Sequence, residues 1–241
     1  MKVLTTNIWR YYNWKKRKEK LVNFLKNENA DIIFLQEATY DGRLKESYKN
    51  QVDEINRELN YSSLVFGRLM EMKKWHNTPI DWEMFYGLGF LSKYPIKHSE
   101  VIILSPVKTN KKFGFMHAII ETGEGDIDLI NVHFENTDEG SKKHLKQTLE
   151  WCKEKNLNPI IAGDFNMKLI DDLKELAIND YEISYLIKQY KSFMPTQFSH
   201  NEKPITLDYL IAHKNKFKIM DVKCINNDVS DHNPLIVELK V

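Results

Sequence analysis

Residues 31–37 read DIIFLQE, a continuous apolar run with an acid at each end. Such a run is typical of a strand covered on both faces, because a solvated face would place a polar residue at every second position. Residues 158–166, NPIIAGDFN, contain a second run of the same kind. We therefore expect buried strands with further layers of structure on both faces.

Strand-like runs also fill the middle and the end of the chain, separated by Gly, Pro and Asn turn signals. They are SSLVFG, GLGFLSK, SEVIILSPV, FGFMHAIIE and DIDLINVHF, followed by residues 205–212, 217–225 and 235–240. Helical periodicity covers 15–30, 44–59 and 141–155, the last with Ser141 as its expected N-cap. This order predicts one α/β domain over residues 1–241, with two sheets face to face and helices outside.

Composition limits the class of protein. The 241 residues are 42% hydrophobic and 12% aromatic, enough for a buried core, and their net charge is +1. A nearly neutral chain gives no general argument that the protein binds nucleic acid, and none against a local basic groove. Every arginine lies within the first 70 residues. A phosphate bound by the later part would therefore be held by lysine, histidine, backbone or metal.

The two cysteines, Cys152 and Cys224, lack metal-type spacing, which favours two free core thiols in a reducing compartment. The opening MKVLTTNIW reads as a strand rather than a signal peptide, and no apolar run approaches the ~20 residues that cross a bilayer. We expect a cytoplasmic monomer without stable membrane insertion.

Residues 68–85, RLMEMKKWHNTPIDWEMF, show no clear period and form the longest doubtful connection. A long connection inside a compact domain is usually functional, so we expect substrate specificity to reside here. Aromatic residues near the expected site could stack bases, line an apolar pocket or simply pack: Trp9, Tyr11, Trp75, Trp82 and Tyr86.

Polar residues occur at or near the ends of six predicted strands. They are Asn7, Glu37, His133, Asp164 with Asn166, Asp208, and the adjacent pair Asp231 and His232. Each alone is compatible with a structural turn. Because strand ends on one side of a sheet converge, the set together predicts a shared site.

The donor types in this set suit one chemistry. Oxygen-rich ligation without cysteine favours Mg²⁺ or Mn²⁺ over zinc, and such ions often bind where a substrate supplies phosphate oxygens. Histidines beside the ion could stabilise a charged phosphorane or protonate a leaving oxygen. The sequence therefore predicts metal-assisted hydrolysis of a phosphoester.

The ordered motifs TTNIW, LQE, GLGFLSKYPI, NVHFEN, GDFN, TLDY and SDH resemble the endonuclease/exonuclease/phosphatase superfamily, the DNase-I-like fold. The resemblance extends from residue 3 to the end of the chain. It implies an α/β (α+β) four-layer sandwich, in which two mixed β-sheets pack face to face with helices on the outside. It also implies a metal site with Glu37 as the principal ligand, Asn7 beside it, and Asp231 from the SDH motif.

The resemblance also implies catalytic roles. Asp164 and Asn166 match the pair that positions and deprotonates the attacking water. His232 matches the histidine that contacts the scissile phosphate, and Asp208 the carboxylate that orients it. His133 matches an acid or phosphate contact. An aspartate behind His232 would also raise its pKa and fix its tautomer.

One departure concerns the TLDY strand, where family members commonly carry an arginine shortly before the aspartate. Here residues 204–207 are Pro, Ile, Thr and Leu, so a phosphate contact from that strand is in doubt.

Substrates in the superfamily include DNA, RNA, tyrosyl-DNA adducts, sphingomyelin and phosphoinositides, and the fold does not select among them. A phosphodiesterase or nuclease is our main hypothesis. A phosphomonoesterase, a lipid or inositol phosphohydrolase, and a non-catalytic binding module are the alternatives.

Overall fold

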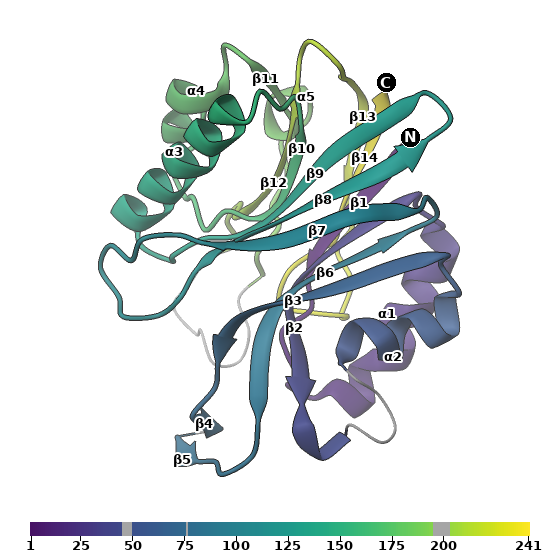
Figure 1. Ribbon diagram of the computed structural model, residues 1–241, viewed down its shortest axis with the longest axis vertical. Coiled ribbons are helices and arrows are strands. Elements are labelled where there is room, and N and C mark those ends of the chain that lie inside the picture. Colours follow the sequence, from purple (N-terminus) through teal and green to yellow (C-terminus); the bar gives the residue numbers. More distant parts are fainter. Residues whose placement is uncertain (45–49, 76, 195–202) are drawn as a thin grey trace.

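The computed structural model describes residues 1–44, 50–75, 77–194 and 203–241. Its centre is a pair of six-stranded β-sheets packed face to face, each with helices on its outer side (Figure 1). This arrangement is the four-layer α+β sandwich expected from the sequence.

Both sheets are mixed, with one parallel pair at the centre and antiparallel neighbours on each side. Sheet I contains, in spatial order, β13 (Lys218–Cys224), β14 (Leu235–Lys240), β1 (Lys2–Asn7), β2 (Ile32–Asp41), β6 (Met84–Ser92) and β3 (Ser63–Glu71). Sheet II contains β11 (Tyr181–Ile183), β12 (Asp208–His213), β10 (Ile160–Asp164), β9 (Gly125–His133), β8 (Gly114–Thr122) and β7 (Ile96–Ile103).

Each parallel pair is joined by a crossover helix. Helix α1 (Trp14–Glu28) connects β1 to β2, and α3 (Asp138–Glu154) connects β9 to β10. Parallel strands end at the same edge of a sheet, and the antiparallel neighbours β14 and β12 begin at that edge. Strand ends that carry polar residues are therefore brought together by topology.

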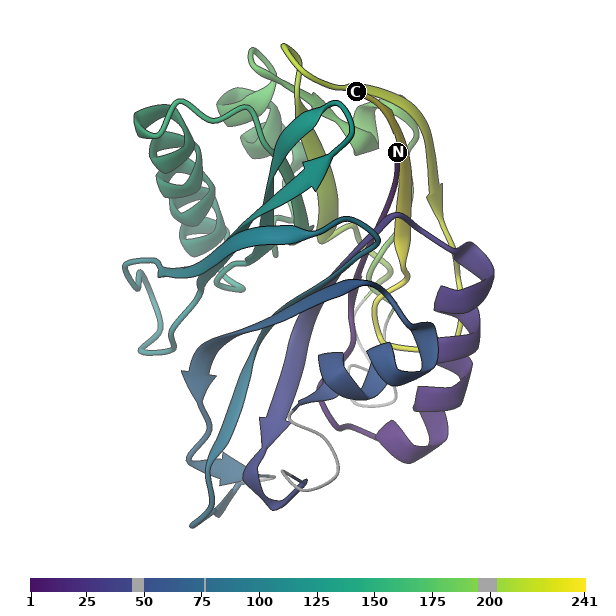
Figure 2. The same ribbon diagram turned by 45° about the vertical axis from the view of Figure 1, so that its right-hand side comes forward.

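The apolar runs are buried on both faces, as the sequence indicates. In β2, Ile32 and Phe34 enter the core between the sheets, while Ile33 and Leu35 pack in a second core beneath α1 and α2 (Gln51–Leu59). A third core lies between sheet II, α3 and α4 (Ile170–Ala177). Figure 2 shows α1 and α2 on one side of the sandwich and α3 with α4 on the other.

Short elements complete the chain. They are the 3₁₀ turn η1 (Gly42–Leu44), the hairpin strands β4 (Lys74–Trp75) and β5 (Thr78–Pro79), and α5 (Ser184–Ile187). No helix among the described residues has the length and apolarity needed to cross a membrane.

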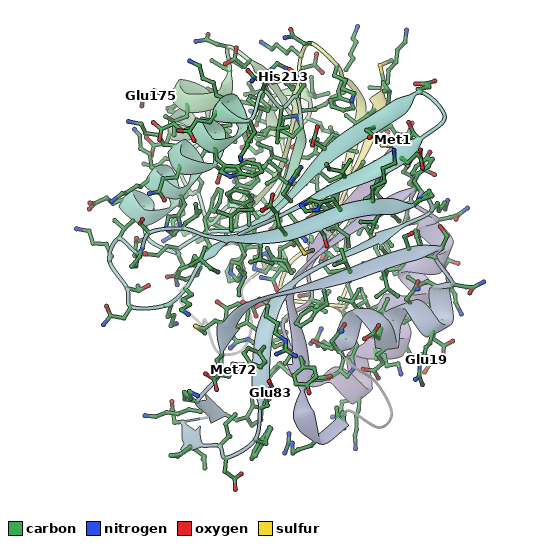
Figure 3. All side chains as sticks on the ribbon, in the orientation of Figure 1. Met1, Glu19, Met72, Glu83, Glu175 and His213 are labelled. Carbon is green, nitrogen blue, oxygen red and sulfur yellow. The ribbon has the colours of Figure 1, made fainter. Side chains whose placement is uncertain are left out.

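Three local expectations need correction. Residues 68–85 are not an irregular loop: β3 and β6 extend into them and the β4–β5 hairpin caps them, with Met72 and Glu83 at its base (Figure 3). Helix α3 begins earlier than expected, because Thr137 Oγ1, not Ser141, caps it by accepting from the Gly140 N–H. Part of the helix expected over 44–59 lies outside the described residues (45–49), and α2 starts after the Asn50 cap.

The cysteines are free, as expected. Cys152 lies on the buried face of α3, whereas Cys224 is only half-buried. Burial raises the pKa of each thiol to about 12, so neither ionises near neutral pH.

Candidate active site

A cavity of about 490 Å³ opens at the edge where the central strands meet. Every residue predicted for the site except Asp208 lies on its wall: Asn7, Glu37, His133, Asp164, Asn166, Asp231 and His232. Asp208 is fully buried directly behind His232. The predicted residues therefore share one site.

Asn7 joins the two sheets at the floor of the cavity. Its Nδ2 donates to Asp164 Oδ2 at 3.1 Å, which links the end of β1 in sheet I to the end of β10 in sheet II. Its Oδ1 accepts from the Trp9 N–H at 2.9 Å, leaving one carbonyl lone pair free of this bond.

Glu37 reaches the cavity through an irregularity in β2. The pairing of β2 with β6 shifts between Leu35 and Ala38, and Glu37 itself has φ of 54°. A bulge of this kind re-aims a side chain out of the regular alternation. Glu37 Oε2 accepts from Arg10 Nε at 2.8 Å. Burial would raise the pKa of Glu37, but Arg10, His133 and His232 outweigh it and hold that pKa below its ordinary value.

The GDFN turn positions Asp164. Gly163 has φ of 142°, and a Cβ there would lie 2.2 Å from the Val132 carbonyl oxygen, so only glycine fits. Asp164 Oδ1 accepts from the Asn166 N–H at 3.0 Å, and Asn166 Nδ2 donates to the Phe134 carbonyl. Burial raises the pKa of Asp164, which makes its carboxylate a better proton acceptor.

The predicted Asp208–His232 hydrogen bond is present. Asp208 Oδ2 lies 2.7 Å from His232 Nδ1, which leaves Nε2 facing Asp164 Oδ2 at 3.9 Å. Burial would lower the pKa of His232, but Asp208 and Asp164 together raise it well above its ordinary value. The two carboxylates therefore favour the imidazolium form, which presents an N–H to the cavity.

His133 lies on the other side of Asp164. Its Nε2 is 3.8 Å from Asp164 Oδ2 and 4.0 Å from Glu37 Oε1. The rings of Tyr86 and Phe113 pack against the imidazole edge-on. The two histidines thus flank one carboxylate.

Asp231 borders the Glu37 side of the cavity. Burial, with a smaller contribution from Glu37, raises its pKa to about 6 despite the neighbouring His232. Ser230 Oγ donates to the Asn7 carbonyl at 2.6 Å, which anchors the SDH turn to the end of β1. Negative charge is therefore concentrated beside Asn7.

Four cations on the cavity wall were not predicted as site residues: Arg10, Lys111, Lys168 and Lys203. Lys203 lies five positions before Asp208, in the segment where the family arginine is missing. Clustering positive charge here suits an anionic substrate although the whole chain is neutral. The position of Arg10, three residues after Asn7 in the loop that follows the first strand, is the one sequence feature that could have indicated its role.

Two buried charged residues support the loops around the cavity. Within the described residues, Arg17 donates only to backbone carbonyls, those of Ile8, Trp9, Arg10, Tyr12 and Val229. It thereby ties the loop after β1 to the loop before the SDH motif. Burial lowers the Arg17 pKa to about 10.

Glu135 supports the segment between β7 and β8. Its carboxylate accepts from the backbone N–H groups of Val107 and Lys108 and from the Thr137 hydroxyl. Burial would raise the pKa of Glu135, but these hydrogen bonds hold it below its ordinary value. The segment fixed in this way carries Lys111 to the cavity wall.

Of the aromatic residues expected near the mouth, the described cavity wall includes Trp9 and Tyr86 but not Tyr11, Trp75 or Trp82. Trp82 instead lies under the Arg43 guanidinium, 3.9 Å from its ring centroid. Met70 is the residue of the 68–85 segment on the described wall.

Comparison with known proteins agrees with this geometry. The model of the endonuclease/exonuclease/phosphatase family matches residues 4–232. No curated protein matches the chain. A family protein from Leptotrichia buccalis superposes with a TM-score of 0.79 at 17% identity, covering 100% of both chains.

Two further solved structures share the fold. Sphingomyelinase C from Streptomyces griseocarneus has a TM-score of 0.71 at 17% identity over 98% of each chain. A D. rerio TDP2 humanised by 14 mutations has a TM-score of 0.71 at 16% identity, covering 100% of this chain and 99% of that one. With the family match spanning nearly the whole sequence, the chain belongs to the endonuclease/exonuclease/phosphatase family of phosphoester hydrolases.

Proposed function

We propose that this protein is a Mg²⁺- or Mn²⁺-dependent phosphodiesterase that directs water onto a phosphate held in the cavity. The observation that carries the proposal is the meeting of Glu37, Asp164 and the Asp208–His232 pair in one lysine-rimmed cavity. Carboxylates alone would repel a phosphate, so a cation and the surrounding basic residues are both needed there.

The residues around Glu37 fit a hard cation. Asn7 keeps a free lone pair on Oδ1, Glu37 binds Arg10 through Oε2 and leaves Oε1 toward the cavity, and Asp231 adds a second carboxylate. Burial is the main cause of the raised Asp231 pKa and Glu37 adds to it, so a bound cation would favour the ionised carboxylate. When bound there, the ion would neutralise phosphate charge and polarise the bond that is broken.

Asp164 is the proposed proton acceptor for water. Its raised pKa favours proton uptake, and the Asn166 N–H holds its carboxylate in place. As the water oxygen forms a bond to phosphorus, its proton passes to Asp164, and the ester oxygen departs with the electrons of the broken P–O bond.

His232 is the proposed electrostatic partner of the phosphate. Asp208 fixes Nδ1, so the protonated Nε2 can donate to a phosphate oxygen as charge develops. His133 can do the same from the opposite side of Asp164. Asp208 acts through His232 and is a positioning residue rather than a catalytic one.

The decisive experiment is a substrate panel assayed with Mg²⁺, Mn²⁺ and EDTA. We expect bis-p-nitrophenyl phosphate to be hydrolysed faster than p-nitrophenyl phosphate, with activity lost in EDTA and restored by either ion. Single- and double-stranded DNA and phospholipid vesicles then identify the substrate class. A preference for the monoester would replace our proposal with a phosphomonoesterase.

Matched variants separate chemistry from folding. Glu37→Ala, Asp164→Ala and His232→Ala should each lower kcat by about 10²-fold or more with an unchanged circular dichroism spectrum. Glu19→Ala, on the exposed side of α1 (Figure 3), is the control and should retain wild-type rates. Wild-type rates in the three site variants would place the hydrolysis outside this site, and no hydrolysis of any substrate would favour the binding-module alternative.

A further inference from the structure

A second cluster of metal-binding side chains lies on sheet II, away from the catalytic cavity. His98 and Glu100 come from the edge strand β7, and His117 lies directly opposite Glu100 on β8. Their ligand atoms all lie within 4.8 Å of one another. Met116 and Ala118 point into the core between the sheets, so His117 lies on the opposite, helix-covered face.

His117 has the surroundings that are usual for a histidine that binds a metal. The residue is 95% buried, and its ring packs against Trp151 of α3 with centroids 5.2 Å apart. Nε2 lies 2.8 Å from Asp128 Oδ1, and because a carboxylate can only accept, Nε2 carries the proton. A carboxylate behind the imidazole fixes the tautomer and leaves the other nitrogen free to bind.

The free nitrogen of His117 has no hydrogen-bond partner among the described residues, although it is buried. Nδ1 points toward Glu100 Oε1, which is 3.5 Å away, and the same oxygen is 3.7 Å from His98 Nε2. Buried polar atoms normally have a hydrogen-bond partner. A buried nitrogen without one, close to a carboxylate oxygen and a second imidazole nitrogen, indicates a site for an ion.

We propose that His98 Nε2, Glu100 Oε1 and His117 Nδ1 bind a zinc-class transition-metal ion. Two imidazoles and one carboxylate suit Zn²⁺, Co²⁺ or Ni²⁺ rather than Mg²⁺, which prefers oxygen donors. Ligands of a tetrahedral zinc ion are about 3.4 Å apart, close to the separations seen here. Three protein ligands leave the fourth position to water.

The competing interpretation is a plain ion pair, with a protonated His117 between Asp128 and Glu100. The geometry disfavours it, because the 3.5 Å separation of Nδ1 and Glu100 Oε1 is too long for a strong charged hydrogen bond. An ion would also link the edge strand β7 to β8. This link would stabilise β7, which pairs with only one strand, β8, in its sheet. This site is independent of the proposed catalytic function.

The test is a Co²⁺ titration of the tag-free, metal-stripped full-length protein, monitored by visible absorption. Zn²⁺ is then added to compete for the bound Co²⁺. Wild type should bind one Co²⁺ with the intense bands of tetrahedral coordination, in addition to any ion in the catalytic cavity. Glu37→Ala should keep this signal, which separates it from any ion in the catalytic cavity. His98→Ala should lose it, and His98 is exposed, so its removal leaves the core intact.

His213→Ala is the matched control, since it removes a histidine at the far end of β12, labelled in Figure 3, and should bind Co²⁺ as wild type does. Asp128→Asn should weaken Co²⁺ binding by about 10–100-fold by loosening His117. Absence of the tetrahedral bands in wild type, or equal binding by wild type and His98→Ala, would overturn the proposal. Zn²⁺ should also raise the Tm of wild type but not of His98→Ala.

Discussion

Replacing Gly163 by alanine tests whether the GDFN turn has the strained, close-packed geometry that places Asp164. Gly163 has φ of 142°, a region that residues with a Cβ rarely adopt, and this strain costs about 1–3 kcal/mol. The new Cβ would also lie 2.2 Å from the Val132 carbonyl oxygen, on the parallel neighbour β9. The obstacle is backbone, so rotating a side chain cannot relieve the overlap.

The two effects together should lower the free energy of unfolding by about 3–5 kcal/mol. For a chain of this size each kcal/mol shifts the Tm by about 2–4 °C, so the Tm should fall by roughly 6–20 °C. Asp164 follows Gly163 directly, so the separation of β10 from β9 should also displace its carboxylate. We therefore expect a lower kcat even at temperatures where the variant is fully folded.

Thermal unfolding followed by circular dichroism, and hydrolysis of bis-p-nitrophenyl phosphate at low temperature, measure the two effects separately. Gly123→Ala is the control, because a Cβ at Gly123 meets nothing within 4 Å. That variant should remain within about 1 kcal/mol of wild type. If Gly163→Ala unfolded within 2 °C of Gly123→Ala and kept wild-type kcat, our account of the turn would be wrong.

Three further changes probe the support of the site. Arg17→Lys should destabilise the protein by about 3 kcal/mol, because an ammonium cannot reach the carbonyls that the guanidinium joins; guanidinium chloride denaturation measures this. Glu135→Gln should cost about 1–3 kcal/mol at pH 7. Folding depresses the Glu135 pKa, so the contribution of its carboxylate is present above the ordinary value of 4.5 and is lost as pH falls through the lower, folded-state pKa. The two proteins should therefore converge in stability as the pH is lowered through that range. Asp208→Asn should lower kcat by about 10-fold or more with little change in KM, because it loosens His232 without touching substrate.

Each of these predictions has a result that contradicts it. Wild-type stability in Arg17→Lys would mean that water replaces the lost hydrogen bonds. A pH-independent difference between Glu135→Gln and wild type would assign its effect to packing rather than charge. A rise in KM without loss of kcat in Asp208→Asn would place Asp208 in substrate binding.

Much of the fold could be predicted from the sequence, because a strand that is buried on both faces consists of consecutive apolar residues. DIIFLQE and PIIAG are apolar throughout, and both became central strands between the inner core and a helix layer. The structure adds that Gly163 of GDFN has φ of 142°, which excludes residues with a Cβ. The order of the elements predicted two sheets with helices outside, and the polar strand ends predicted a shared site. The family resemblance implied the full four-layer sandwich.

Only tertiary structure brings the partners of those residues together, and the Asp208–His232 pair was predicted through the family resemblance and not from a local pattern. Asp208 and His232 are 24 positions apart, and they meet because β12 and β14 both begin at the edge where the parallel strands end. Nothing in the local pattern shows that Glu37 would take a positive φ and pair with Arg10, because the bulge depends on the register of β2 against β6.

The regions predicted least well also depend on contacts between elements that are distant in the sequence. β3 and β6 extend into segment 68–85, where a short hairpin joins them. Of its described residues only Leu69 and Met84 are buried, so most of the segment has no core contact to impose alternation. The His98, Glu100 and His117 cluster was invisible for a related reason. Alternation in a strand shows which residues share a face, but only the register between β7 and β8 sets Glu100 opposite His117.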